Sequence, residues 1–296
     1  MNWDDLKVFL AVARAESLSG AGRGLKVDPA TVGRRIGRLE EELGAPLFAK
    51  SPQGYALTDA GQRLMGHAER AEQAMGAAIE ELAGQAGALS GQIRIGAPDG
   101  CANYLLPQVC ARIVRENPDL EVQIVALPRV FNLSKREADM AIGVSPPAAG
   151  RLTVQKITDY RLHLAAHRDY LARHDPIETV ADLRGHRMIG YIPDMIFDKE
   201  LDYLSESGVE RVSLASNSVS VQFNWVRQGG GIGIVHDFAI PSASGLQKIL
   251  VDDLSLIRSF YLIRHADDRR MERLNRFAAA LSEGVKAEVA RLEALC

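Results

Sequence analysis

The sequence lacks the features that mark several specialised classes of protein. Its three cysteines, Cys101, Cys110 and Cys296, cannot all pair with one another and do not have metal-ligand spacing, which excludes a disulfide-rich scaffold and indicates a reducing cytoplasm. No apolar run reaches the roughly 20 residues that a membrane helix needs. We expect no signal peptide, because charged residues interrupt the N-terminal apolar positions. A net charge of −3 excludes a generally basic nucleic-acid coat protein, so any contact with nucleic acid must be local.

Signatures of catalysis are equally scarce. The seven histidines are scattered, with no zinc-ligand pair beside a carboxylate base, and no serine lies in a nucleophile-elbow motif. The glycines of Gln228–Ile234 (QGGGIGI) follow a predicted helix and precede a predicted strand, the reverse of a phosphate-binding loop. Cys101, at the start of a predicted helix, is a candidate reactive thiol, with an inert thiol as the alternative. We therefore expect a protein that is not an enzyme and that uses no metal and no cofactor.

Positive charge gathers instead on one segment near the N-terminus. Residues 21–39 hold five basic side chains and one acidic side chain. Asp28 and Pro29 are typical of the N-cap and the first residue of a helix. Helical spacing then places one apolar stripe on the buried face (Val32, Ile36, Leu39) and leaves four polar side chains on the other faces (Thr31, Arg34, Arg35, Arg38). This division is typical of a recognition helix, whose apolar stripe holds the core while the opposite stripe reads DNA.

The segments on either side of this helix support the same interpretation. Apolar residues at helical spacing predict a preceding helix capped by Asn2. Residues 50–57 (KSPQGYAL) predict a wing hairpin with Pro52 and Gly54 at its turn. A three-helix cap with a charged, solvated face is the alternative, but the capped turn, the basic face and the wing together favour DNA binding. The candidate DNA-contacting residues are Ser17, Ser19, Arg23, Pro29, Ala30, Thr31, Arg34, Arg35, Arg38, Lys50, Ser51 and Gln53.

These motifs resemble the winged helix-turn-helix domain of LysR-type transcriptional regulators. The resemblance extends over about sixty positions and is carried by Leu6, Phe9, Ala13, Ala21, Leu25, Val27, Val32, Arg34, Ile36, Arg38–Glu40, Glu42–Gly44, Pro46–Phe48, Leu57, Thr58, Ala60 and Gly61. Two departures stand out. Asp28-Pro29-Ala30 replaces the usual Ser-Gln-Pro at the start of the recognition helix, and Gly33 replaces the serine before the arginine. We therefore expect Ala30, Thr31, Arg34 and Arg35 to read bases, without transferring the family's typical target.

A long connecting helix is predicted from an N-cap at Thr58 to about Leu89. Alternating spacings of four and three residues form a heptad seam, which consists of Leu64, Ala68, Ala71, Met75, Ala78 and Leu82. Four glycines lower the intrinsic helicity, so we expect this helix to depend on a partner. The resemblance implies a dimerisation helix, and a monomeric packing helix is the alternative. Residues 87–91 are the expected hinge to the next domain.

Strand and helix patterns alternate through the remaining residues. Strands are predicted at 93–97, 121–127, 139–144, 154–159, 162–166, 187–191, 212–215, 231–235 and 259–264. Helices are predicted at 104–115, 180–183, 197–207, 219–228 and 271–292. This alternation predicts parallel sheets flanked by helices, with crossings between two lobes near 159–161 and 263–265. The segment resembles the two-lobed effector domain of the same family, which is similar to periplasmic solute-binding proteins.

Ligands in open α/β sheets bind beyond the carboxyl ends of the strands, which selects the loops of an effector site. The candidate residues are Asp99, Gly100, Cys101, Ala102, Arg129, Val130, Phe131, Ser145, Tyr191, Asn217, Ser218, Val219 and His236. Free N–H groups where helices begin near Ala102 and Val219 suit a carboxylate, and the family often senses small organic acids. Asp99 opposes an anion, and it either binds a hydroxyl or an amine or caps its helix. Asn217 and Ser218 are likewise either caps or ligand contacts.

The sequence as a whole predicts a cytoplasmic transcriptional regulator of α/β class with a helix-rich N-terminal domain. We expect a winged helix-turn-helix over 1–58, a dimerisation helix and hinge over 59–90, and a periplasmic-binding-protein-like effector domain over 91–296. Its lobe I would span about 91–160 and 265–296, and its lobe II about 161–264. The resemblance implies a homodimer or homotetramer that binds double-stranded promoter DNA and a small effector, an organic acid or another polar metabolite, with RNA polymerase as a possible partner. An enzyme or a solute-binding module that uses the same cleft is the alternative.

Overall fold

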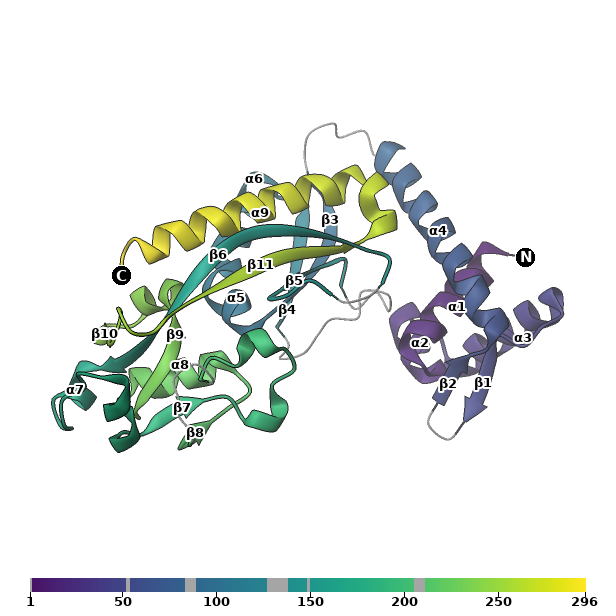
Figure 1. The fold of residues 1–296 in the computed structure, drawn as a ribbon. Coiled ribbons are helices and arrows are strands. Elements are labelled where there is room, and N and C mark those ends of the chain that lie inside the picture. Colours follow the sequence, from purple (N-terminus) through teal and green to yellow (C-terminus); the bar gives the residue numbers. More distant parts are fainter. Residues whose placement is uncertain (1, 52–53, 83–88, 127–137, 148–149, 205–210) are drawn as a thin grey trace. The chain divides into compact units, whose positions relative to one another are not determined.

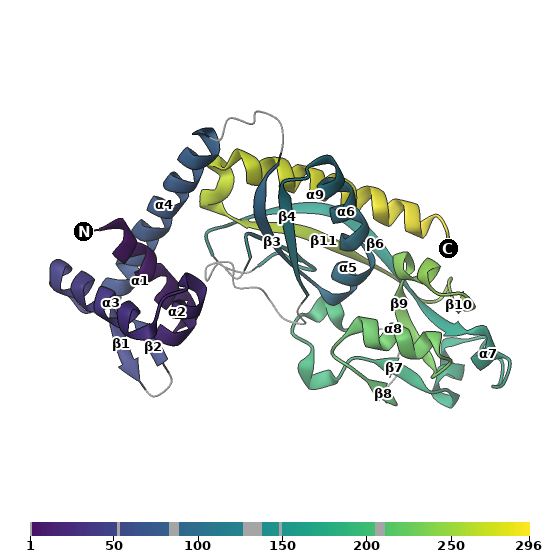
Figure 2. The same ribbon diagram turned by 180° about the vertical axis from the view of Figure 1, so that it is seen from behind.

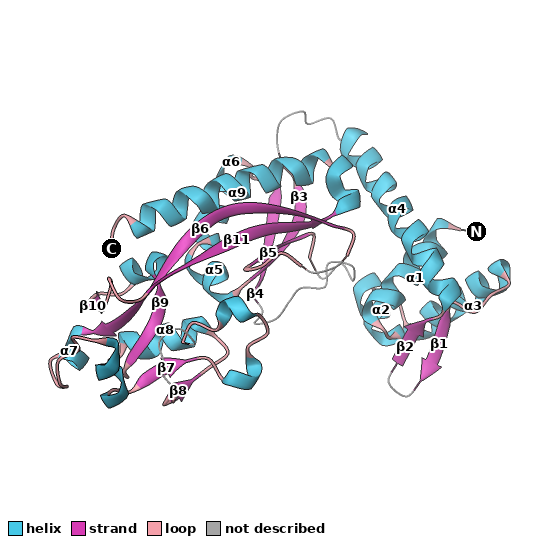
Figure 3. Ribbon diagram, in the orientation of Figure 1, coloured by secondary structure: helices cyan, strands magenta, loops and turns pink. Residues whose placement is uncertain are grey.

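The computed structural model describes residues 2–51, 54–82, 89–126, 138–147, 150–204 and 211–296. The chain divides into two compact units, residues 1–87 with 267–271 and residues 88–266 with 272–296 (Figure 1). Figure 3 shows that the first unit is mostly helical, whereas the second combines a large sheet with helices. No helix among the described residues is long and apolar enough to cross a membrane.

The first unit has the predicted order of helix, helix, recognition helix, hairpin and long helix. Its elements are α1 (Trp3–Ala15), α2 (Leu18–Leu25), α3 (Pro29–Leu43), β1 (Phe48–Ser51), β2 (Gly54–Leu57) and α4 (Asp59–Leu82). Three predicted caps are confirmed. The side chain of Asn2 accepts a hydrogen bond from Asp4 N, that of Asp28 accepts from Ala30 N, and the Thr58 hydroxyl accepts from Gly61 N. Local side-chain chemistry therefore sets where these helices begin.

The core of the first unit lies between α1, α3 and α4. Phe9, Val32, Leu39 and Ala68 are fully buried. Ala68 belongs to the predicted dimerisation seam, and this part of the prediction is wrong, because a residue without exposed surface in its own domain is not available to a partner helix. An alanine fits this position because the small side chain allows α4 to approach the core closely.

The other residues of the seam divide between packing within their own domain and exposure to a partner helix. Leu64 and Ala71 are half-buried and pack against the same core as Ala68, whereas Met75 is 48% exposed. The side chains of Ala78 and Leu82 lie outside the described part of the structure, as do residues 83–88 of the predicted helix and hinge. An ion pair between Arg14 of α1 and Glu72 of α4, 2.6 Å from Nη2 to Oε2, holds α4 against α1.

The second unit is built on a nine-stranded sheet with the strand order β4-β3-β5-β11-β6-β9-β7-β8, in which β10 also pairs with β6. The strands are β3 (Gly91–Ala97), β4 (Leu120–Ala126), β5 (Met140–Gly143), β6 (Leu152–His167), β7 (Met188–Gly190), β8 (Leu214–Ala215), β9 (Ile232–His236), β10 (Leu246–Lys248) and β11 (Ser255–His265).

Two long antiparallel strands, β6 and β11, join two lobes of this sheet. Strands β4, β3 and β5 are parallel in one lobe, and β9, β7 and β8 are parallel in the other, so the prediction of parallel sheets holds within each lobe. The strands predicted at 154–159 and 162–166 are one continuous strand, β6. On β11, the register shifts between Phe260 and Tyr261, and Tyr261–Arg264 already pair with β5 of the first lobe. The second crossing therefore lies earlier than the predicted 263–265.

Helices cover the sheet of the second unit. They are α5 (Asp99–Tyr104), α6 (Leu106–Glu116), α7 (Arg168–Leu171), α8 (Val219–Arg227) and α9 (Glu272–Glu293). Helix α9 follows the long strands and packs on α6 and β6, and Figure 2 shows the same arrangement from behind. The helix predicted over 104–115 is interrupted at Leu105, where α5 ends and α6 begins.

The prediction of an amphipathic helix over 197–207 is wrong for those of its residues that the structure describes. A single 3₁₀ turn, η4 (Lys199–Leu201), replaces it, and residues 205–210 lie outside the description. Leu201 and Tyr203 are both buried, at 4% exposure each. Because these side chains are two positions apart, an extended backbone after the turn buries both, whereas a helix would point them about 200° apart.

Candidate DNA interface and effector cavity

Helix α3 has the two faces that a recognition helix needs. Val32, Ile36 and Leu39 are at most 3% exposed and form its underside. Arg34 is exposed on another face. The apolar underside fixes the helix to the domain, and the remaining surface is free to enter a groove.

A chain of hydrogen bonds orders the first turn of α3. Thr31 Oγ1 donates to Asp28 Oδ2 at 2.5 Å, and Arg34 Nη2 donates to Thr31 Oγ1 at 2.8 Å. Asp28 Oδ1 also accepts from the Ala30 and Thr31 N–H groups. The side-chain hydrogen bond from Thr31 is the main cause that lowers the pKa of Asp28, so the carboxylate stays charged. The Arg34 guanidinium is therefore drawn towards the start of the helix.

Arg38 has a structural contact in addition to any contact with DNA. Its Nε donates to Asp5 Oδ2 at 2.9 Å and its Nη2 donates to Asp5 Oδ1, and these hydrogen bonds raise the pKa of Arg38. Asp5 is 1% exposed, so Arg38 neutralises a buried carboxylate on α1. The Arg38 side chain nevertheless remains 58% exposed.

The other predicted DNA-contacting residues lie on or beside α2, α3 and the wing. Ser17 caps α2 by accepting from Gly20 N at 3.0 Å. Arg35 is half-buried, and the exposed candidates are Ser19, Arg23, Pro29 and Ala30. Lys50 and Ser51 lie in β1, but their side chains are outside the described part of the structure, and so is Gln53.

Two contacts that the sequence analysis missed position the wing. Glu40 Oε1 accepts from the N–H groups of Leu47 and Phe48, at 2.7 and 3.2 Å. Tyr55 N donates to Glu16 O at 2.9 Å, and a Cβ on the neighbouring Gly54 (φ +132°) would lie 2.5 Å from that same oxygen. Glycine is therefore required at the close approach between the hairpin and the end of α1. These contacts hold the base of the wing hairpin against α3 and the end of α1.

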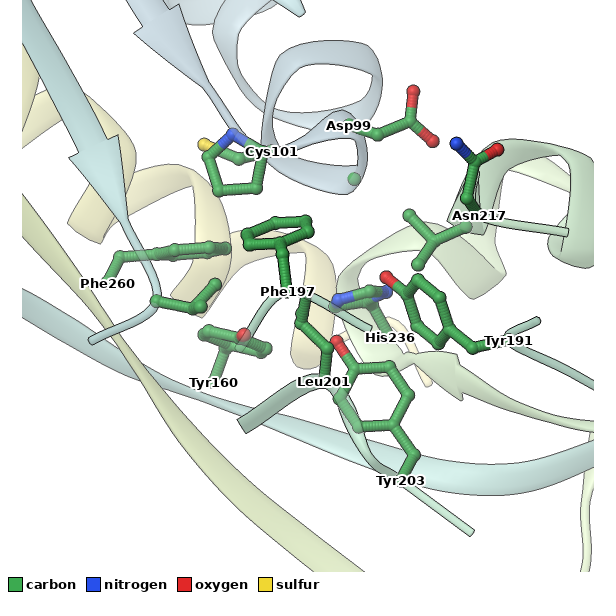
Figure 4. Close-up of a pocket in the computed structure, with 14 residues that line it drawn as sticks. Asp99, Cys101, Tyr160, Tyr191, Phe197, Leu201, Tyr203, Asn217, His236 and Phe260 are labelled. Carbon is green, nitrogen blue, oxygen red and sulfur yellow. The ribbon is translucent and has the colours of Figure 1, made fainter. Parts of the chain in front are cut away.

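A cavity lies between the two lobes of the second unit (Figure 4). Its volume is about 20 Å³, which is enough for about one water molecule. The lining residues are Pro98, Asp99, Gly100, Cys101, Val144, Tyr160, Tyr191, Phe197, Leu201, Tyr203, Asn217, Val219, His236 and Phe260. A second cavity, of about 250 Å³, lies behind Tyr191 and Tyr203 within one lobe.

The structure brings together about half of the predicted effector residues. Those that line the cavity are Asp99, Gly100, Cys101, Tyr191, Asn217, Val219 and His236. Ala102, Ser145 and Ser218 lie outside its lining. Arg129, Val130 and Phe131 lie outside the described residues. Ser145 Oγ donates a hydrogen bond to Asp198 Oδ2, which ties the end of β5 to the segment before η4.

The largest omission from the prediction is the aromatic lining. Tyr160 and Phe260 lie in the middle of β6 and β11, whereas the rule for α/β sheets selects only residues at the ends of strands. Their rings stack with centroids 4.1 Å apart. The predicted crossing at 159–161 was the available signal, because a side chain at a crossing faces the space between lobes. Phe197 and Tyr203 come from irregular segments, and local sequence pattern gave no signal for them.

His236 and the tyrosines form a buried aromatic group. The His236 ring lies 5.4 Å from that of Tyr160 and 6.0 Å from that of Tyr203. Burial lowers the pKa of His236 to about 4, so the imidazole is neutral at neutral pH. Burial also raises the pKa values of Tyr160, Tyr191 and Tyr203, so their hydroxyls stay protonated.

Asp99 takes a role that neither predicted alternative described. Pro98 occupies the N-cap position of α5. The Asp99 carboxylate instead reaches the start of α8, where Oδ2 accepts from Ser218 Oγ at 2.8 Å and from Ser220 N at 2.9 Å. Its Oδ1 accepts from Asn103 Nδ2 at 2.9 Å. Ser218 is itself the N-cap of α8, because its Oγ accepts from Val221 N. Asp99 therefore links α5 of one lobe to the start of α8 in the other lobe.

The cysteines and the metal-ligating residues do not form a reactive centre in the described part of the chain. Cys101 and Cys110 are buried, and burial raises the pKa of Cys101 strongly and that of Cys110 to about 11. Neither is a thiolate at neutral pH. No group of three or more histidine, cysteine, aspartate or glutamate side chains among the described residues is arranged to hold a metal ion.

A winged helix-turn-helix with an exposed arginine face, joined to a two-lobed α/β unit with a cavity between its lobes, is typical of a ligand-responsive DNA-binding protein. Comparison with known proteins specifies the family. Residues 3–62 match the bacterial regulatory helix-turn-helix protein of the lysR family, and residues 86–286 match the LysR substrate binding domain. The chain belongs to the LysR family and is a LysR-type transcriptional regulator, with a DNA-binding domain and an effector-binding domain.

Relatives along nearly the whole chain agree with this assignment. The HTH-type transcriptional regulator PtxR of Pseudomonas aeruginosa is 26% identical over 245 residues, which cover 81% of this chain and 78% of the relative. The Mau operon transcriptional activator of Paracoccus denitrificans is 26% identical over 291 residues, 95% of this chain and 96% of the relative.

Solved structures share the fold. CrgA, a LysR-type transcriptional regulator of Neisseria meningitidis, matches 96% of this chain and 99% of its own with a TM-score of 0.60 and 23% identity. A full-length OxyR variant of Pseudomonas aeruginosa matches 97% of this chain and 98% of its own with a TM-score of 0.70 and 20% identity.

Proposed function

We propose that this regulator binds a two-fold-related promoter site as a dimer or tetramer, with one α3 helix in each major groove. The observation that carries this proposal is the position of Arg34, which is exposed on a helix whose underside is buried. Arginine is suited to bidentate hydrogen bonds with guanine O6 and N7. The exposed seam residue Met75 and the following turns of α4 are the candidate contacts between protomers.

The candidate residues divide into two roles. Ala30, Thr31, Arg34 and Arg35 read base edges. Phosphate contacts come from α2, the middle of α3 and the wing, through Ser17, Ser19, Arg23, Arg38, Lys50, Ser51 and Gln53, and Pro29 at the start of α3 contributes only an apolar contact with the DNA backbone. Phosphate contacts position the protein on DNA without reading its sequence. Arg38 combines a phosphate contact with its ion pair to Asp5.

The small-molecule effector binds between the two lobes of the second unit. Because the cavity holds about 20 Å³, binding requires the lobes or the lining side chains to separate. An effector that binds the separated arrangement more tightly shifts the population towards it. We further propose that this shift changes how the oligomer holds promoter DNA and RNA polymerase in the cytoplasm, and that no chemical step on the effector is involved.

Arg34→Ala tests the DNA interface. Its affinity for DNA flanking its own coding region, measured by fluorescence anisotropy, should fall by about 1–3 kcal/mol, or roughly 5- to 150-fold, with relaxed discrimination at one base position. Arg23→Ala should weaken binding to all sequences and reduce the slope of log affinity against log salt by about 1. Arg115→Ala, an exposed arginine in the last turn of α6, is the matched control. Unchanged affinity in Arg34→Ala would refute the assignment of α3 as the reading helix.

A further inference from the structure

We propose that the Asp99 carboxylate serves as the built-in anion of the effector cavity, so that the cavity selects a small organic cation, an amine or a quaternary ammonium compound, over a carboxylate. This inference rests on the proposed function, because it names the ligand class of the same cavity. It replaces the organic-acid expectation and keeps the alternative in which Asp99 binds an amine.

The first argument is that the anion position at the start of α8 is already filled. Backbone N–H groups at a helix N-terminus attract a carboxylate. In this chain Asp99 Oδ2 accepts from Ser220 N and Ser218 Oγ, at 2.9 and 2.8 Å. An effector carboxylate would have to displace this side chain and would then lie beside a second negative charge.

The second argument is the charge of the lining. Asp99 is an ionisable carboxyl group, and none of the fourteen lining residues that the structure describes is a lysine or an arginine. The buried His236 imidazole is neutral at neutral pH, because burial lowers its pKa to about 4. The nearby Arg258 is paired with Glu200, with Nε 3.1 Å from Oε2. The lining therefore offers a counter-ion to a cation and no counter-ion to an anion.

The third argument is the chemistry of the walls. Tyr160, Tyr191, Phe197, Tyr203 and Phe260 surround the space beneath Asp99, as Figure 4 shows. Faces of aromatic rings attract ammonium groups, and rings grouped around one carboxylate suit an organic cation.

An unused polar atom in the same wall points to a ligand with hydrogen-bonding groups. Tyr160 is 1% exposed, and its hydroxyl lies beside the Tyr203 hydroxyl but forms no hydrogen bond of good geometry within the described residues. A phenol oxygen can accept as well as donate, so its lone pair is available to an N–H donor of a bound amine. Phe197, which is 37% exposed, is the lining ring most accessible to solvent, so its displacement enlarges the cavity.

The test uses the full-length protein with probes matched in shape and opposite in charge. These are phenethylamine against 3-phenylpropionate, and tetramethylammonium against pivalate, with affinity measured by calorimetry and thermal shift. Wild-type protein should bind each cation at least tenfold more tightly than its matched acid. Asp99→Asn, which keeps the size of the side chain, should lose at least tenfold in cation affinity. Asp99→Ser, which empties the start of α8, should bind the acids more tightly than wild type does. Asp194→Asn, at an exposed carboxylate, is the control and should bind as wild type.

Three results would overturn the proposal: no binding of either cation to wild type, acid affinity equal to or above cation affinity, or unchanged cation affinity in Asp99→Asn. Should Asp99→Ser fail to fold, the comparison of wild type with Asp99→Asn decides alone. DNA affinity measured on the same preparations separates this inference from the proposed function. If wild-type protein binds DNA specifically but shows no preference for cations, only the proposed ligand class is refuted. If wild-type protein does not bind DNA specifically, the proposed function as a regulator is refuted.

Discussion

The buried imidazole of His236 should make the second unit sensitive to mild acid. Burial lowers its pKa from 6.5 to about 4 in the folded protein. Between these two values the unfolded chain binds a proton that the folded chain does not bind. Stability is therefore fully present above about pH 6.5 and declines as the pH falls towards 4, because protonation favours the unfolded state.

The size of the effect follows from the gap between the two pKa values. Each pKa unit corresponds to about 1.4 kcal/mol, so this group removes roughly 3 kcal/mol of unfolding free energy between pH 6.5 and 4. For a unit of about two hundred residues, this loss lowers the Tm by roughly 6–12 °C. The perturbation is His236→Gln, which retains polarity but takes up no proton in this range.

Scanning calorimetry of full-length wild type and His236→Gln from pH 7 to pH 4 provides the measurement. The Tm of the second unit should fall more steeply with acid in wild type, and the difference between the two slopes isolates His236 from other titrating groups. Tyr160→Phe changes a ring in the same cavity without changing any group that titrates in this range, so it should keep the wild-type slope. Parallel pH profiles for wild type and His236→Gln would refute the reasoning.

Two further predictions concern packing and thiol chemistry. Leu39→Ala should destabilise the first unit by about 2–5 kcal/mol because it removes fully buried methyl groups. Leu43→Ala, at a position 41% exposed on the same helix, should cost roughly 1 kcal/mol. Hydrogen exchange of α1 and α3 peptides measures both free energies, and equal costs would contradict the assignment of the buried face. In the native protein a thiol reagent should modify the exposed Cys296 first, and Cys101 and Cys110 only in denaturant; rapid native labelling at Cys101, detected by peptide mass, would contradict its burial.

Local chemistry explains why the first unit could be predicted closely from sequence. The caps Asn2, Asp28 and Thr58 act within three residues of their own helices, and the spacing of Val32 and Ile36 fixes the buried face of α3. Interactions of this range are visible in a sequence pattern.

Contacts between distant residues explain what the sequence did not reveal. Asp99 meets Ser218 across 119 positions, and Tyr160 meets Phe260 across the two long strands. Arg38 is drawn to Asp5 across 33 positions, a contact that its predicted place away from the apolar stripe and its predicted role as a DNA contact did not include. Which residues form such pairs depends on strand order and on helix packing. The rule that ligands bind at the ends of strands predicts these pairs only in part, and the spacing of side chains along the sequence does not predict them.

The burial of Ala68 has a mechanical consequence for signalling. Since Ala68 and the Arg14–Glu72 ion pair fasten the middle turns of α4 to the body that carries α3, the two helices reorient together. Helix α4 has 24 residues and is therefore about 36 Å long. A tilt of about 3° over that length displaces one end by about 2 Å relative to the other, several times the roughly 0.5 Å range of donor–acceptor distances in a hydrogen bond to a base. We expect a lever of this length to convert a slight angular change of α4 into the gain or loss of an operator contact.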